Sequence, residues 1–73
     1  MAGRKNEITG RELEVLRLLS EGFNSREISE KLYISSNTVE YHRKQLLRKT
    51  QSRNVAQLIG NAFRSNLLKH SGE

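Results

Sequence analysis

Four helix-start signatures lie close together in this chain, and they constrain its fold more than any other feature. Three of them are capping boxes, in which an N-cap side chain and a Glu or Gln three residues later satisfy free backbone N–H groups. These pairs are Thr9 with Glu12, Asn24 with Glu27 and Asn54 with Gln57, and Ser35 is a further N-cap. The four starts predict four short helices and an all-α fold.

Apolar residues at helical spacing follow these starts and indicate where each helix ends. A leucine stripe follows Thr9, and Gly22 can close the first helix as a left-handed C-cap. We expect the second helix to end near Leu32, the third to cover residues 36–49 and the fourth to end around Asn66.

Length and composition exclude several classes of protein. A chain of 73 residues has room for one domain, which we place at 8–68 between flexible polar segments at 1–7 and 69–73. The chain has no Cys and only two His, which predicts no disulfide, no thiol chemistry and no metal site. It also has no apolar run near the roughly 20 residues that cross a bilayer. We therefore expect a cytoplasmic protein with no membrane contact.

Catalysis is not predicted either. A nucleophile needs a base within hydrogen-bonding reach and a third group that orients this base. The chain contains neither Cys nor Asp, His42 and His70 are far apart in sequence, and its five Gly are scattered. We expect no enzyme, no cofactor and no small-molecule ligand in this domain.

The positive charge is concentrated in one segment. Residues 36–54 contain five basic residues against the single acidic Glu40, and so carry four of the chain's five excess positive charges. At about 100° per residue, this predicted helix packs through Val39 and Leu46. Its opposite face presents Asn37, Glu40, Tyr41, Lys44 and Arg48. A basic face of this kind is an expected footprint for phosphate groups.

Two short helices joined by a three- or four-residue turn, with the second basic on its free face, are typical of a helix-turn-helix. In that motif the second helix lies in the DNA major groove, which is about 12 Å wide. Polar side chains there meet base edges, while Lys, Arg and hydroxyl groups hold phosphates. The pattern predicts binding to double-stranded DNA. The alternative is a helix-turn-helix that binds proteins, which Glu40 on the outward face keeps open.

Three stretches of sequence stand in a fixed order: ITGRELEVL at 8–16, EGFNSREIS at 21–29 and ISSNTVEYHR at 34–43. Together they resemble the DNA-binding domains of LuxR/FixJ-type (GerE-like) bacterial transcription regulators. The resemblance covers about residues 8–68. It implies a four-helix bundle with a central helix-turn-helix that regulates transcription.

The resemblance also implies which residues contact DNA. It places base reading on Glu40, Tyr41 and Lys44, which lie on the outward face as well. Lys44 would donate to guanine or phosphate, and Tyr41 would touch a thymine methyl group or a sugar. Glu40 would accept from a cytosine amino group or repel the wrong phosphates. The expected phosphate contacts are Ser36, Thr38, Arg43, Arg48, Lys49, Arg26 and Arg53.

The implied partners are double-stranded DNA, a second copy of the chain and RNA polymerase. The family usually forms a two-fold dimer on DNA through its fourth helix, here through Val55, Leu58, Ile59 and Ala62. Family members usually carry a receiver or ligand-binding domain, and neither is present in these 73 residues. The sequence does not distinguish a free-standing regulator from the C-terminal domain of a larger one.

A few residues depart from the family pattern or need a separate interpretation. Ser29 stands where the family usually has Ala, Thr50 where it has Leu, and Gln51 where Gly often ends the recognition helix. A left-handed backbone at Gln51 would be mildly strained. We expect His42 to face the body of the domain in a structural role and Tyr33 to pack within the turn.

Overall fold

The computed structural model describes residues 7–68, which form four helices and no strand. The helices are α1 (Gly10–Ser20), α2 (Ser25–Leu32), α3 (Ser36–Lys49) and α4 (Val55–Arg64). The predicted all-α fold with a central helix-turn-helix is confirmed. The predicted flexible segments lie outside the described residues, except for Glu7.

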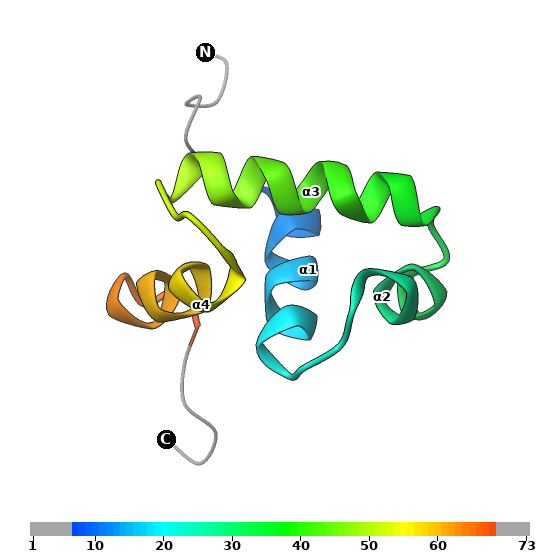
Figure 1. Ribbon diagram of the computed structural model, residues 1–73, viewed down its shortest axis with the longest axis horizontal. Helices are drawn as coiled ribbons and strands as arrows, with labels where there is room; N and C mark the ends of the chain where they lie inside the picture. The colour runs from blue at the N-terminus through cyan, green and yellow to red at the C-terminus, as the bar shows by residue number, and fades with distance from the viewer. Residues whose placement is uncertain (1–6, 69–73) are drawn as a thin grey trace.

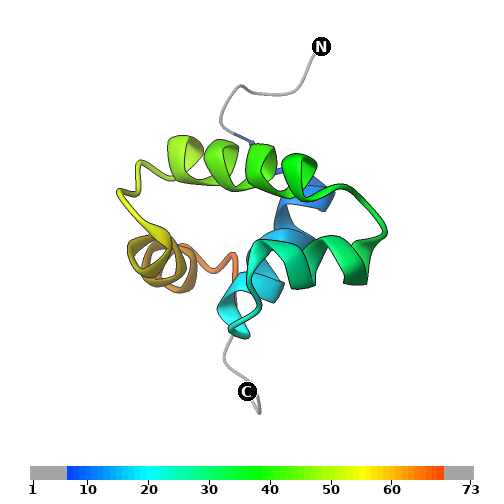
Figure 2. The ribbon, with the colours of Figure 1, turned by 45° about the vertical axis from the view of Figure 1, so that its right-hand side comes forward.

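α1 and α3 are the central helices of the domain. α3 lies across α1, with α2 below its N-terminal part and α4 below its C-terminal part (Figures 1 and 2). Both α1 and α3 pack against every other helix, whereas α2 and α4 do not contact each other within residues 7–68. The orientation of α3 is therefore fixed from three sides.

The buried core draws side chains from all four helices. Its completely buried large residues are Val15, Leu16, Ile28, Val39, Leu46 and Leu58. Val39 and Leu46 are the two residues predicted to form the packing face of α3, and this prediction is confirmed. None of the helices in the described part of the chain is both long and apolar enough to cross a membrane.

The helix N-termini follow the predicted caps with one correction. Thr9 and Asn24 form complete capping boxes with the Glu three residues later, and the Ser35 side chain accepts from the Thr38 N–H. Asn54 also caps α4. The predicted Asn54 capping box is wrong, because the Gln57 side chain accepts from the N–H of Arg53 instead.

All four helices end in the same way, and only the first uses glycine. A left-handed residue stands one or two positions after the last residue of each helix: Gly22, Tyr33, Gln51 and Asn66, with φ values of 97°, 57°, 56° and 64°. After each of them a backbone N–H returns to a carbonyl five residues earlier, as Ser52 does to Leu47 at 2.9 Å. This is the Schellman arrangement. α4 consequently ends at Arg64, before the expected Asn66.

Candidate nucleic-acid interface

The outward face of α3 is solvent-exposed along its length. Glu40, Tyr41 and Lys44 are all exposed, and Tyr41 retains 58% of its accessible surface. The Lys44 side chain makes no hydrogen bond or ion pair with the residues that the structure describes. Three chemically different groups thus stand side by side: an acceptor, an aromatic ring with a hydroxyl group, and an uncommitted ammonium donor. Their predicted role in base reading stays a prediction.

Hydroxyl groups surround the N-terminus of α3. Ser35 Oγ lies 2.9 Å from Thr38 Oγ1 and also accepts from the Thr38 N–H at 3.1 Å. Ser36 and Thr38 are exposed. Hydroxyl and backbone donors at a helix N-terminus suit an anionic oxygen, because the helix dipole is positive at that end.

Three of the predicted phosphate-binding arginines are well exposed. Arg48 Nη2 donates to Gln45 Oε1 at 2.7 Å within α3. Arg26 forms an ion pair with Glu30 at 3.6 Å on α2, and Arg53 lies in the turn between α3 and α4. Exposed pairs of this kind hold their side chains only weakly, so these guanidinium groups can reorient toward DNA.

Arg43 is held more firmly than the other arginines. Its Nη1 donates to Ser25 Oγ on α2 at 2.8 Å and lies 3.7 Å from Glu40 Oε2. Both contacts use the same nitrogen, which leaves the other guanidinium donors available. Ser25 was not predicted as a site residue, because helix periodicity describes one helix at a time and gives no signal for a contact between two helices.

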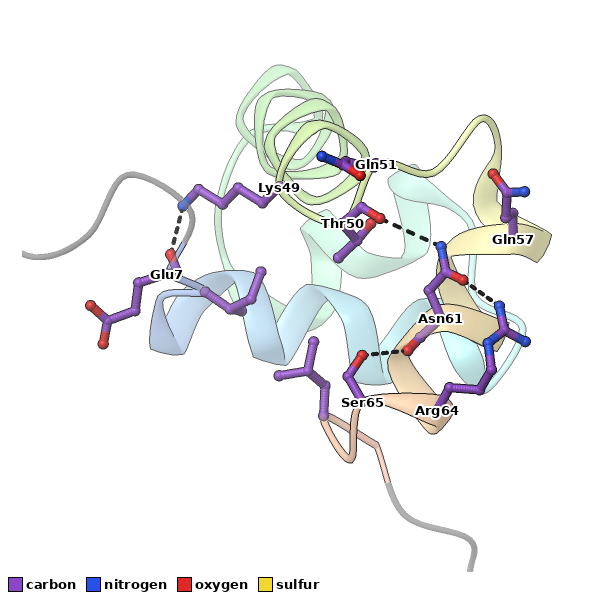
Figure 3. A pocket seen from close by; sticks show the side chains of 10 residues that line it. Glu7, Lys49, Thr50, Gln51, Gln57, Asn61, Arg64 and Ser65 are labelled. Atoms are coloured by element: carbon purple, nitrogen blue, oxygen red, sulfur yellow. Dashed lines mark hydrogen bonds between the residues drawn. The ribbon is translucent and has the colours of Figure 1, made fainter.

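Lys49 requires a correction. Its Nζ lies 2.8 and 3.0 Å from the two Glu12 carboxylate oxygens and 2.9 Å from the Glu7 carbonyl oxygen. The Lys49 side chain is 9% exposed and that of Glu12 is 4% exposed. The ammonium group therefore joins the end of α3 to the start of α1, and it is not available to a phosphate. The contact with Glu7 is drawn in Figure 3.

The Glu12 side chain takes part both in the N-terminal capping box of α1 and in the ion pair with Lys49. Burial alone would raise the pKa of its carboxyl group. Hydrogen bonds from Lys49 and from the Thr9 N–H outweigh burial and, with the positive charge of Lys49 and a smaller contribution from His42, lower the pKa. Glu12 therefore stays ionised at neutral pH, and its buried negative charge is balanced.

A hollow lies beside this junction. It lies between residues 7–8, the end of α3 and α4 (Figure 3). Asn61 Nδ2 donates to Ser52 Oγ at 2.9 Å, and the Asn61 amide oxygen accepts from Arg64. The first of these bonds ties α4 to the turn after α3, and the second lies within α4. Within residues 7–68 no group of three or more His, Cys, Asp or Glu could hold a metal ion.

The predicted dimer residues of α4 divide into two groups. Leu58 and Ala62 are completely buried in the core of one chain, so they cannot form a contact between two chains. This is a correction, because the helical period marks an apolar stripe without saying which neighbour covers it. Val55 and Ile59 are half-buried and keep part of their surface for a partner.

Two aromatic side chains differ in how they are supported. The half-buried His42 ring meets the Tyr41 ring edge-on, with centroids 5.6 Å apart, and its expected structural role stays a prediction. His42 Nδ1 is buried and has no hydrogen-bond partner among residues 7–68. Tyr33 is 93% exposed, so the expectation that it packs within the turn is wrong. Its left-handed backbone directs the side chain away from the core.

Comparison with known proteins places these features in context. The family described as bacterial regulatory proteins, luxR family, matches residues 6–62. The oxygen regulatory protein NreC of Staphylococcus carnosus is 36% identical over 61 residues, which are 84% of this chain and 28% of that protein. NreC of Staphylococcus aureus is 36% identical over 62 residues, 85% of this chain and 29% of its own length.

A solved structure shares the fold. The response regulator ChrA of a heme-sensing two-component system superposes with a TM-score of 0.84 at 28% sequence identity. The superposition covers 93% of this chain and 33% of ChrA. The chain thus spans about a third or less of the length of each of these proteins.

Proposed function

Because the chain belongs to the luxR family of bacterial regulatory proteins, and is thus a transcription-regulator domain rather than an enzyme, we propose that it binds specific sites in double-stranded DNA with α3 in the major groove. ChrA is a response regulator, and we place this domain in a regulator of the same class. A contact between this domain and RNA polymerase stays a prediction.

The observation that carries this proposal is the division of α3 into two faces. Val39 and Leu46 are completely buried, while Glu40, Tyr41 and Lys44 are exposed on the other side. The packing that anchors the helix therefore leaves its polar face open to base edges. Only polar side chains on such a face can read the donor and acceptor pattern of the major groove.

Contacts to the DNA backbone would come from the surroundings of that face. We assign them to hydroxyl and guanidinium groups of α2, α3 and the turn after α3, all exposed except the partly buried Arg43: Ser36, Thr38, Arg26, Arg43, Arg48 and Arg53. Such contacts fix the orientation of a protein on DNA and carry no sequence information themselves. Lys49 is left out because Glu12 binds its ammonium group.

We further propose that two copies bind a two-fold related site through α4. Val55 and Ile59 keep exposed surface next to Gly60, and the nearest atoms to a Cβ built at Gly60 belong to the flexible end of Arg64. A second helix can approach closely over such a residue. Sedimentation on a two-half-site duplex should give two chains per DNA, and a strict one-to-one complex would contradict the dimer.

A salt titration on mixed-sequence duplex DNA tests DNA binding itself. The logarithm of the association constant should fall with the logarithm of salt concentration, with a slope of about −0.9 per neutralised phosphate. Fluorescence anisotropy between 50 and 200 mM salt measures this slope. Absent binding, or binding that does not depend on salt, would contradict the proposal and favour the alternative of a protein-binding module.

A further inference from the structure

A series of contacts runs from α2 through Arg43 to the outward face of α3. The Arg43 guanidinium group donates to Ser25 Oγ at 2.8 Å and lies 3.7 Å from the Glu40 carboxylate. The Arg43 side chain is 29% exposed, whereas that of Glu40 is 52% exposed. The guanidinium group thus lies between the first residue of α2 and an exposed carboxylate on the outward face.

We propose that Arg43, anchored by Ser25, is a positioning residue that holds the Glu40 carboxylate toward the amino group of a base, and that this base is cytosine. The inference rests on the proposed function, because it needs α3 in the major groove. It assigns a part in base choice to two residues, Ser25 and Arg43, that do not lie on the base-reading face.

The chemistry of a carboxylate selects the base. An ionised Glu side chain only accepts hydrogen bonds, and the major groove offers amino donors on cytosine N4 and adenine N6. Adenine also presents the acceptor N7 beside its amino group, which repels a carboxylate. Guanine and thymine present acceptors there. Cytosine alone offers a donor without an acceptor on the same base.

The Arg43 guanidinium group supplies a positive charge beside the Glu40 carboxylate. A carboxylate in the major groove is repelled by the surrounding phosphates, and a neighbouring cation offsets this repulsion. An exposed ion pair between residues three apart is weak by itself. The bond to Ser25 restricts the guanidinium group, so that it stays beside Glu40 when phosphates compete for it.

The domain contains a second Arg–Glu ion pair, which serves as a control because its arginine is not anchored by another helix. Arg26 and Glu30 on α2 lie 3.6 Å apart, a distance similar to that between Arg43 and Glu40. Their side chains are 86% and 67% exposed, and within residues 7–68 no hydrogen bond or ion pair links the Arg26 side chain to another helix. Glu30→Gln therefore makes the same charge change as Glu40→Gln without touching the proposed relay.

Selection of bound sites from random duplex DNA tests the inference. We compare the wild type with Glu40→Gln, Ser25→Ala and Arg43→Lys, and use Glu30→Gln and Ser29→Ala as matched controls. Circular dichroism verifies that each variant is folded. Base preference at each position is the readout, because a purely structural change lowers affinity for all sequences and leaves this preference unchanged.

The wild type should select cytosine at one position of each half-site by at least about tenfold. Glu40→Gln should move that preference to adenine, because a Gln amide can bond both N6 and N7. Ser25→Ala and Arg43→Lys should reduce the cytosine preference at least threefold at this position only. Both controls should keep the wild-type profile.

A chemical probe checks the same hydrogen bond. N4-methylcytosine pairs with guanine but places a methyl group where the major-groove amino hydrogen would be. Its introduction at the selected position should weaken binding of the wild type at least fivefold and leave binding of Glu40→Ala unchanged. Equal losses in the two proteins would overturn the inference.

Failures of the two proposals can be told apart. If the wild type selects no site, the proposed function fails and the inference fails with it. If it selects a site without the cytosine preference, only the inference is overturned. The same holds if Ser25→Ala and Arg43→Lys weaken binding to every sequence equally, because Arg43 would then act on phosphate alone and would not position Glu40.

Discussion

Arg48 and Lys49 are neighbours on α3 with the same charge, yet they lie in different environments. Arg48 is exposed, and among residues 7–68 its side chain bonds only Gln45 of its own helix. The Lys49 side chain is 9% exposed and bonds Glu12 and the Glu7 carbonyl oxygen. One step along a helix turns a side chain by about 100°. This rotation alone separates a cation available to a ligand from one that joins two helices.

The same contrast extends along α3. Its inner side holds the domain together through Val39, Leu46 and the Lys49–Glu12 pair. Its outer side carries Glu40 and Lys44, which contribute little to packing. Stability and DNA recognition are therefore assigned to opposite faces of one helix, and substitutions on the two faces should have different consequences.

The largest expected effect comes from Lys49→Met. It leaves the Glu12 carboxylate buried without its partner, and the loss of one member of such a pair costs about 3–5 kcal/mol of unfolding free energy. Arg48→Met should change the unfolding free energy by less than about 0.5 kcal/mol. Urea denaturation followed by circular dichroism measures both. Similar losses of unfolding free energy in the two variants would contradict the difference between Lys49 and Arg48.

A second variant keeps this test informative if Lys49→Met does not fold. Adding Glu12→Gln removes the unpaired charge, and Gln still suits the third position of a capping box. The double variant should recover most of the lost stability. A double variant as unstable as Lys49→Met would mean that the lysine acts through packing alone.

The next effect concerns DNA, and it separates Lys44 from Arg48. Lys44→Ala should reduce discrimination between matched and mismatched sites by about 1–3 kcal/mol, if Lys44 contacts a base edge. Arg48→Ala should weaken binding to all sequences alike and reduce the salt slope by about 1. Anisotropy titrations with a selected duplex and a scrambled duplex measure both quantities. Unchanged discrimination in Lys44→Ala would contradict its role.

Local signals in the sequence were sufficient for the fold. The caps at Thr9, Asn24 and Ser35 depend on residues at most three positions apart, so the neighbouring residues alone set those helix starts. The outward face of α3 was predicted equally well, because a single helical period defines it. The caps and this period lie within single helices.

Contacts between helices could not be predicted in this way. Lys49 was expected to contact phosphate, but its partner Glu12 is 37 residues away in sequence. Leu58 and Ala62 belong to an apolar stripe whose neighbour is the core of the same chain. The contact between Arg43 and Ser25 spans 18 positions. Each of these features depends on how the helices pack.

A smaller effect should appear on acidification. The pKa of Glu12 is lowered from its ordinary value of about 4.5 by folding, so the folded state binds the carboxyl proton less readily than the unfolded state does. The Glu12 contribution to stability is therefore fully present above pH 4.5 and is lost as the pH falls through the lowered pKa.

Urea denaturation at a series of pH values measures this loss, and Glu12→Gln is the reference without the ionisable group. The difference in stability between wild type and Glu12→Gln should shrink as the pH decreases below 4.5. A difference that stays constant with pH would contradict the buried pair.

The smallest expected effect lies at the end of α3, directly after Lys49 and Thr50. Gln51 has a left-handed backbone with φ of 56°, where glycine has no Cβ penalty. Gln51→Gly should raise the unfolding free energy by about 0.5–1 kcal/mol, since the relief of strain exceeds the added flexibility of the unfolded chain. Asn66→Gly, at an equivalent position after α4, should gain less because Asn tolerates this conformation.

Gln51 is exposed and outside the base-reading group, so DNA affinity should stay within about twofold while thermal denaturation shifts upward. Lower stability in Gln51→Gly would show that the glutamine side chain itself supports the end of α3.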